Sequence, residues 1–159
     1  MLCKNNKTPA QIVCDLLQAY SEHRVDDASA MLAEDFKRFG DPDMTFPWNK
    51  QQYHNMWVGF CTAFPDFKFE LTNYIESGNT VVVEMIESGT FTVPYPGTSR
   101  ASVEPSGKFY KDWDCAWYEV NEDGLITEVR AYLTNNFGRT HSIAGAVDDL
   151  ANVAKIFDN

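Results

Sequence analysis

Two aspartates, Asp112 and Asp114, lie within an aromatic stretch in a pattern suited to acid–base chemistry. The stretch, residues 108–120, contains no Gly or Pro and ends at the turn residues 121–124, which predicts a long β-strand. Because side chains alternate along a strand, both aspartates fall on one face. A carboxylate beside large rings is costly unless it is paired, hydrated or used. This face is therefore either solvated or part of a site.

A third carboxyl, Glu87, interrupts the apolar face of another predicted strand, residues 80–93. On a face turned toward the core, a carboxylate either lines a cavity or is paired. Gly89 beside it suggests a β-bulge, which would turn Glu87 outward. If Glu87 and Asp114 share an apolar pocket, their pKa values are pushed apart, and one becomes an acid and the other a base.

Aromatic residues elsewhere in the chain are suited to holding a flat, apolar substrate, although each of them is equally suited to the core. The expected contacts are Trp48, Tyr53, Trp57, Phe60, Tyr110, Tyr118 and Tyr132, together with Asp112 and Thr134. The hydroxyls of Tyr110, Tyr118 and Thr134 could bind a substrate oxygen.

Composition narrows the class of partner. The 159 residues fit one domain, and 44% hydrophobic residues allow a substantial core. A net charge of −10 disfavours nucleic acid and anionic membranes as partners, so we expect a small apolar molecule. The four cysteines form no CxxC and the three histidines show no ligand spacing, so we expect free thiols, no metal and no cofactor. With no signal-like or membrane-spanning run, we expect a cytoplasmic protein.

The remaining elements should position these residues. Capping patterns and apolar stripes predict helices, and alternating runs predict strands joined by hairpins. The expected order is a loose arm at 1–7, helices at 9–20, 26–33 and 50–64, an irregular segment at 36–46, strands at 67–76, 80–93, 108–120 and 125–134, and a C-terminal helix at 142–158. This order predicts a single α+β domain with helices packed on one face of a curved antiparallel or mixed sheet. His54 lies one position off the apolar stripe of its helix and should be at the surface or the rim.

Three short motifs in this order resemble the SnoaL-like polyketide cyclases: Ala-Phe-Pro-Asp at 63–66, Glu-Ser-Gly-Thr at 87–90 and Asn-Glu-Asp-Gly-Leu-Ile at 121–126. These cyclases belong to the nuclear transport factor two-like superfamily, with ketosteroid isomerase and limonene epoxide hydrolase. The resemblance covers roughly residues 9–138. It implies a cone-shaped α+β barrel, open at one end, with an apolar pocket between helices and sheet, and a homodimer paired through the sheet.

The resemblance also points to candidate catalytic residues. In these cyclases an acid near the end of the last strand does acid–base work, and Thr134 stands at the matching place. Glu87 matches an acid of the epoxide hydrolases, and Asp41 resembles the base of the isomerases. Ala116 matches the isomerases' protonated Asp, and Asp114 lies two residues earlier on the same face. The expected catalytic residues are thus Asp114 with Glu87 or Asp41.

Fold does not determine chemistry, so three functions stay open. The first is a cofactor-independent enzyme that isomerises, cyclises or dehydrates an apolar carbonyl compound. The second is a binding protein for an apolar ligand, which the threonine at position 134 favours. The third is an interaction module, which predicts an exposed apolar patch.

Overall fold

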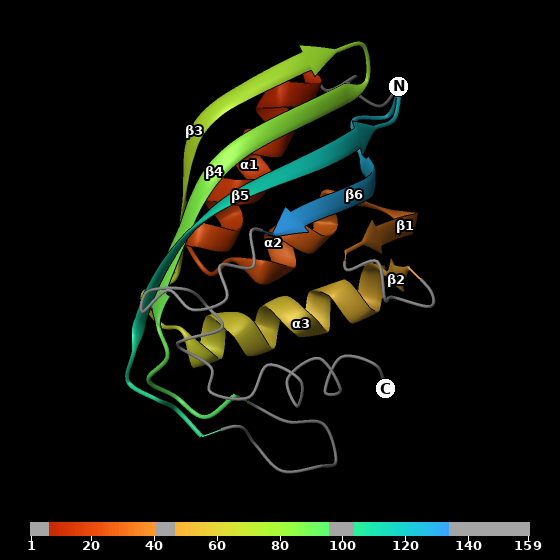
Figure 1. Cartoon of the computed structure of the whole chain (residues 1–159). Helices are drawn as coiled ribbons and strands as arrows, with labels where there is room; N and C mark the ends of the chain where they lie inside the picture. The colour runs from red at the N-terminus through yellow and green to blue at the C-terminus, as the bar shows by residue number, and fades with distance from the viewer. Residues whose placement is uncertain (1–6, 41–46, 96–103, 134–159) are drawn as a thin grey trace.

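The strands of the protein form one sheet, and the helices pack against one of its sides (Figure 1). A computed structural model describes residues 7–40, 47–95 and 104–133. In chain order the elements are α1 (Pro9–Ser21), α2 (Val25–Ala30), β1 (Leu32–Phe39), β2 (Trp48–Asn49), α3 (Lys50–Ala63), β3 (Lys68–Ser77), β4 (Thr80–Thr90), β5 (Phe109–Val120) and β6 (Ile126–Leu133). The sheet has the order β2-β1-β6-β5-β4-β3, and only the pairing of β1 with β6 is parallel.

Both long helices begin at the capping boxes that the sequence predicts. The Thr8 side chain accepts a hydrogen bond from the backbone N–H of Gln11, whose own side chain accepts one from the backbone of Thr8. Asn49 and Gln52 make the same reciprocal pair at the start of α3. These bonds satisfy backbone donors that a helix start would otherwise leave unpaired.

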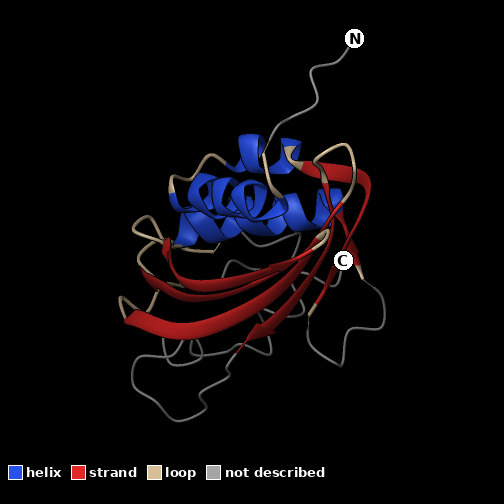
Figure 2. Ribbon diagram, turned by 90° about the horizontal axis from the view of Figure 1, so that it is seen from above, coloured by secondary structure: helices blue, strands red, loops and turns tan. Residues whose placement is uncertain are grey.

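The sheet bends around the helices, which lie inside its curve (Figure 2). We call the side that faces the helices the inner face and the opposite side the outer face. Among the described strands the sheet remains open, because β2 and β3 are its two edges. The cone-shaped α+β architecture is confirmed, but the expected barrel is a curved open sheet.

Strand β1 corrects the sequence analysis, which placed residues 26–33 in a helix and residues 36–46 in an irregular segment. The helix α2 ends at Ala30, and Ile126 then donates a backbone hydrogen bond of 2.9 Å to the carbonyl of Met31. Pairing with β6 shifts register between Leu32 and Lys37, so the alternation of buried and exposed residues is broken. A strand without alternation, whose partner is remote in sequence, carries little local signal.

Several expectations fall outside the described residues. These are the arm up to residue 6, the candidate residues Asp41 and Thr134, and the predicted C-terminal helix at 142–158. The other predicted strands and helices are present, with ends that differ by at most three residues. The strand predicted at 80–93, for example, ends at Thr90.

Candidate active site

Strand β5 has two different faces. Its inner residues are all buried: Tyr110, Asp112, Asp114, Ala116, Tyr118 and Val120. The residues between them are exposed or half-buried: Phe109, Lys111, Trp113, Cys115, Trp117 and Glu119. The carboxyls of Asp112 and Asp114 therefore lie on the helix side of the sheet, with exposed fractions of only 6% and 5%.

Glu87 joins these aspartates from the neighbouring strand. In the β4–β5 register Glu87 is directly opposite Asp112, and Met85 is opposite Asp114. The register runs from Thr80 to Thr90 without a shift, so the bulge expected at Gly89 is absent there and Glu87 stays inward, 7% exposed. Gly89 has another role, because a Cβ at this position would lie 3.3 Å from the Phe64 side chain.

Glu87, Asp112 and Asp114 form what we call the carboxyl cluster. Burial raises the pKa of Glu87 well above its usual value, and the charge and hydrogen bond of Asp114 and the charge of Asp112 raise it further. A hydrogen bond between two carboxyls requires a proton on one of them. A raised pKa favours the protonated form of Glu87, in which its O–H can donate to Asp114.

The hydroxyl of Tyr110 lies next to the carboxyl cluster and is fully buried. Burial raises the pKa of Tyr110 well above its usual value, and the charges of Glu87 and Asp114 raise it further. The hydroxyl favours the ionised form of Glu87, but in the described part of the chain it makes no hydrogen bond of acceptable geometry. A buried donor without an acceptor costs about 1–3 kcal/mol, so this hydroxyl is available to a bound oxygen.

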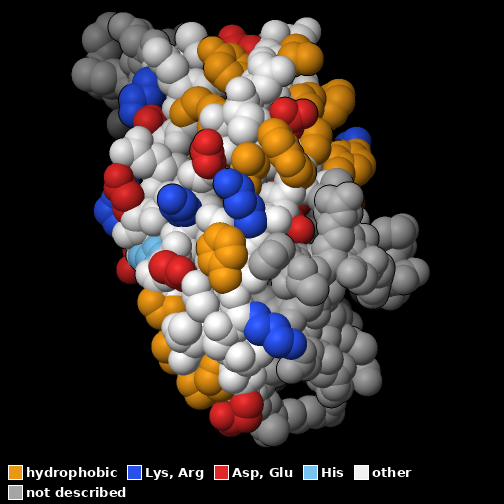
Figure 3. All heavy atoms as spheres, turned by 60° about the vertical axis from the view of Figure 1, so that its left-hand side comes forward, with side chains coloured by type: hydrophobic (Ala, Val, Ile, Leu, Met, Phe, Trp, Pro, Cys, Tyr) orange, Lys and Arg blue, Asp and Glu red, His pale blue; other side chains and the backbone are white. Residues whose placement is uncertain are grey.

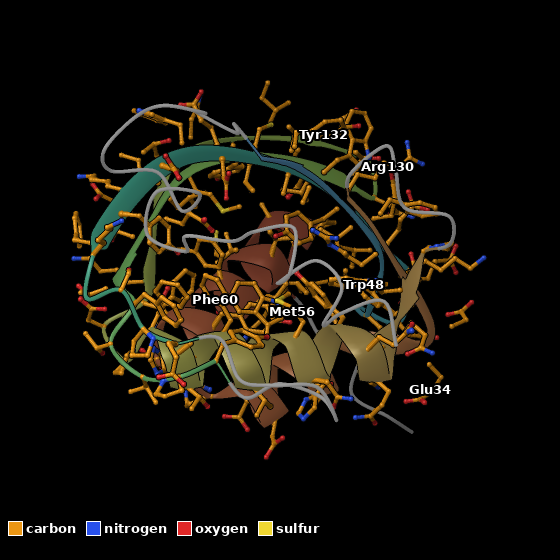
Figure 4. All side chains as sticks on the ribbon, turned by 60° about the horizontal axis from the view of Figure 1, so that its bottom comes forward. Glu34, Trp48, Met56, Phe60, Arg130 and Tyr132 are labelled. Atoms are coloured by element: carbon orange, nitrogen blue, oxygen red, sulfur yellow. The ribbon has the colours of Figure 1, made fainter. Side chains whose placement is uncertain are left out.

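Half-buried apolar side chains of β2 and α3 point toward the inner face of the sheet. Figure 4 shows Trp48, Met56 and Phe60 pointing from β2 and α3 toward the inner face of the sheet. Phe60 reaches β5, where its ring centroid lies 6.5 Å from that of Tyr110. The guanidinium of Arg38 lies 4.7 Å above the Trp48 ring and places a positive charge beside these apolar groups.

The other expected substrate contacts separate into two groups. Tyr53, Trp57 and Tyr118 lie on the inner side and are buried. Tyr132 lies on the outer face, where it is opposite Cys115 and 56% exposed (Figure 4). The structure therefore does not bring Tyr132 to the carboxyl cluster.

Two residues of this region were not expected from the sequence. Tyr20 ends the apolar stripe of α1 and stacks on Trp57, with ring centroids 4.2 Å apart. Arg38 belongs to the segment that was predicted to be irregular. A tyrosine at the end of an apolar stripe is a weak signal, and the position of Arg38 depends on the pairing of β1 with β6.

His54 lies away from the carboxyl cluster, in agreement with the surface position expected for it. It lines a shallow surface pocket with Asp26 and Lys50, and its Nε2 lies 3.6 Å from the Asp26 carboxylate. Within residues 7–40, 47–95 and 104–133, no group of three His, Cys, Asp or Glu side chains is arranged to hold a metal ion. The described helices include none with the length and apolarity needed to cross a membrane.

Comparison with known proteins identifies the family. The chain belongs to the SnoaL-like domain family, which matches residues 13–129. Among curated proteins no match was found. This SnoaL-like domain thus has a curved sheet whose inner face carries buried carboxyls, and helices with aromatic side chains pack against that face.

Solved structures show the same fold at low identity. AclR from Streptomyces galilaeus is 12% identical with a TM-score of 0.69, over 89% of this chain and 96% of AclR. A SnoaL-like polyketide cyclase from Agrobacterium tumefaciens is 15% identical with a TM-score of 0.63, over 81% and 93%. A limonene epoxide hydrolase-like epoxide hydrolase from Mycobacterium tuberculosis is 16% identical with a TM-score of 0.64, over 92% and 95%. At these identities the likeness shows the fold alone.

Proposed function

We propose that this protein is a cofactor-independent enzyme that isomerises, cyclises or dehydrates an apolar carbonyl compound. The observation that supports the proposal is the burial of Glu87 and Asp114 together on the inner face, where burial and the charge of Asp114 raise the pKa of Glu87. A carboxyl with a raised pKa beside a second carboxyl can supply an acid and a base in the same place. The three reactions share one early step, the removal of a proton next to a carbonyl.

The arrangement assigns a role to each group. The carboxylate of Asp114 takes the proton from the carbon next to the substrate carbonyl. When the substrate binds, the O–H of Glu87 leaves Asp114 and donates to the substrate oxygen, as does the O–H of Tyr110, where negative charge develops. Phe60, Met56 and Trp48 provide an apolar surface that excludes water, and burial keeps the pKa of Glu87 high.

Deuterium exchange tests this proposal without knowledge of the natural substrate. A simple apolar ketone, 2-tetralone, is incubated with the protein in D₂O, and exchange at the carbon next to the carbonyl is followed by NMR. We expect exchange above the buffer rate, and we expect Asp114→Asn to lower it by about 10²- to 10⁴-fold. Asp123→Asn, in the exposed turn before β6, is the matched control and should exchange at the native rate.

The same experiment separates the enzyme from the alternative, a binding protein for an apolar ligand. Binding of 2-tetralone with equal affinity by the native protein and Asp114→Asn, without exchange in either, would favour the binding protein. We place the enzyme in the cytoplasm, where the free thiols of Cys14, Cys61 and Cys115 would remain reduced.

We also propose that the protein is a homodimer paired through the outer face of the sheet. One row of side chains crosses five strands on this face: Ile75, Val82, Trp117, Arg130 and Phe39. Trp113 and Tyr132 lie beside it, both about half exposed at 51% and 56%. Figure 3 shows hydrophobic side chains interspersed with acidic and basic ones on the side of β3 and β4. Such a mixed surface can be self-complementary about a two-fold axis.

The dimer is tested by charging the outer face. In Trp113→Glu/Trp117→Glu, like charges would meet across the two-fold axis, so we expect a monomer in sedimentation velocity where the native chain is a dimer. The control is Lys68→Glu, an exposed change of charge near the edge of β3. A native chain that sediments as a monomer at micromolar concentration would refute the dimer.

A further inference from the structure

Asp112 is the one member of the carboxyl cluster that takes no direct part in the proposed reaction. It is directly opposite Glu87 in the β4–β5 register, and the two side chains are 6% and 7% exposed on the inner face. Side chains in such opposite positions have Cβ atoms about 4.5–5.5 Å apart. Two carboxyls this close together and removed from water are costly to ionise at the same time, and a proton on one of them removes that cost.

The geometry favours Glu87 as the carboxyl that keeps the proton. Asp112 and Asp114 are two residues apart on one face of β5, which corresponds to about 7 Å of strand. Glu87 is opposite Asp112 and lies within hydrogen-bonding reach of Asp114, so it has two like charges close to it. Each aspartate has only one close carboxyl, Glu87, and a more distant one. A proton on Glu87 therefore relieves both close repulsions at once.

The other side chains that face Glu87 do not favour its proton in this way. On β3 its opposite neighbour is Phe69, which carries no charge. The hydroxyl of Tyr110 favours the ionised form of Glu87. Tyr53 of α3 is within the influence of the charge of Glu87, but burial raises the pKa of Tyr53, so it is neutral. The two aspartates are thus the groups of β5 that oppose a charge on Glu87.

These two aspartates differ during the proposed reaction. As Asp114 takes the substrate proton, a C–H bond breaks, an O–H bond forms on Asp114, and the electron pair of the C–H bond moves toward the carbonyl oxygen. Asp114 is then neutral and no longer opposes a charge on Glu87. Asp112 takes no part in the transfer, so its charge remains opposite Glu87 throughout the step.

We propose that Asp112 is a positioning residue that acts through Glu87: its negative charge keeps the proton on Glu87 while Asp114 serves as the base. Glu87 therefore donates a hydrogen bond to the substrate oxygen without giving up its proton. In this role Asp112 does not contact the substrate. The inference deepens the proposed function and rests on it, but the proton on Glu87 is measured without substrate, so the two can fail separately.

NMR tests this inference directly, in the full chain labelled with ¹³C at the side-chain carboxyl of its glutamates. The Glu87 signal is the one that is missing from Glu87→Gln. In the native protein it should titrate at higher pH than the other glutamates, and in Asp112→Asn its midpoint should fall by about one pH unit or more. Deuterium exchange of 2-tetralone should lose its rate at correspondingly lower pH in Asp112→Asn.

Glu84→Gln is the matched control. It also removes a carboxylate, but from the exposed side of β4, and should leave the titration of Glu87 unchanged. Asp112→Glu restores a negative charge and should return the midpoint toward the native value, which a purely structural role would not do. Thermal melts identify an Asp112→Asn protein that does not fold, in which case Asp112→Ser decides.

A native Glu87 signal that titrates together with the other glutamates would overturn the inference. So would an equal midpoint in the native protein and Asp112→Asn. A lowered midpoint in Asp112→Asn, without deuterium exchange in the native protein, would support the coupling of the two carboxyls while refuting the proposed reaction. Exchange whose pH dependence is the same in the native protein and Asp112→Asn would support the reaction and refute the role of Asp112.

Discussion

The sheet contains two pairs of acidic residues, one pair on each face. In each pair the two residues lie directly opposite each other on neighbouring strands. Glu87 and Asp112 are opposite each other on the inner face of β4 and β5. Glu119 and Glu128 are opposite each other on the outer face of β5 and β6. Like charges in such positions repel, so both pairs carry the same unfavourable contact. Their surroundings decide what becomes of it.

The outer pair is compensated by hydrogen-bond donors and an ion pair. Glu119 accepts hydrogen bonds from the Thr80 hydroxyl at 3.0 Å and from the Trp117 indole at 2.7 Å, and Glu128 is paired with Arg130. The inner pair is buried, and Glu87 is bonded to another carboxyl, Asp114. On the outer face, hydrogen bonds and an ion pair offset the repulsion, whereas on the inner face burial favours a proton on Glu87.

The largest effect on stability is expected from a comparison of two adjacent aromatic residues of β5, one on each face. Tyr118 is 3% exposed on the inner face and Trp117 is 38% exposed on the outer face. We expect Tyr118→Ala to lower the free energy of unfolding by about 3–5 kcal/mol, because it leaves a cavity in the core. Trp117→Ala should cost about 1 kcal/mol or less in the monomer. Urea unfolding measures both losses in a Trp113→Glu background, which we expect to weaken the proposed dimer and whose monomeric state sedimentation velocity checks. Equal losses would contradict the assignment of the faces.

The sequence was sufficient to predict the elements whose signals are local. The capping boxes at Thr8 and Asn49 and the alternation of β5 are read within a few residues. Strand β1 was not predicted because its register shift removes the alternation and its partner is remote. Local pattern is informative only where a regular period persists.

The site was harder to predict, because it depends on which face of each strand meets the helices. Large rings occur on both faces of β5, so only the packed structure places Asp114 inside. On β6, Ile126 and Val129 are both buried although they are three residues apart, and the register shifts nearby. The alternation of inner and outer side chains could not be continued from these two residues to Tyr132. Tyr132 was therefore wrongly expected on the inner face.

The next prediction concerns how stability depends on pH. The pKa of Glu87 is raised in the folded protein, so the folded state binds more protons than the unfolded state between the two pKa values. Stability is therefore lost as pH rises from the usual glutamate pKa through the raised one. Glu87→Gln is neutral at every pH and can still donate to Asp114, so it should melt like the native protein near pH 4 and higher at pH 8. Each kcal/mol of difference corresponds to about 2–4 °C in Tm.

Thermal melts across this range measure that difference, with Glu84→Gln on the exposed side of the same strand as the control. The control should follow the native curve. A Glu87→Gln protein that loses Tm relative to the native chain at pH 8 would show that the carboxylate is stabilised by its surroundings, and would contradict the raised pKa.

The smallest effect is expected on the outer face. Glu119→Gln keeps an oxygen that can accept from Thr80 and Trp117 and removes the repulsion with Glu128, so it should stabilise the protein by about 0.2–1 kcal/mol. Exposed charges are screened by salt, so urea unfolding should show this gain at low salt and lose it near 1 M. The gain from Glu87→Gln at pH 8 should persist at both salt concentrations, because buried charges are screened far less. Equal salt dependence of the two variants would mean that both carboxylates are solvated, and the distinction between the faces would then fail.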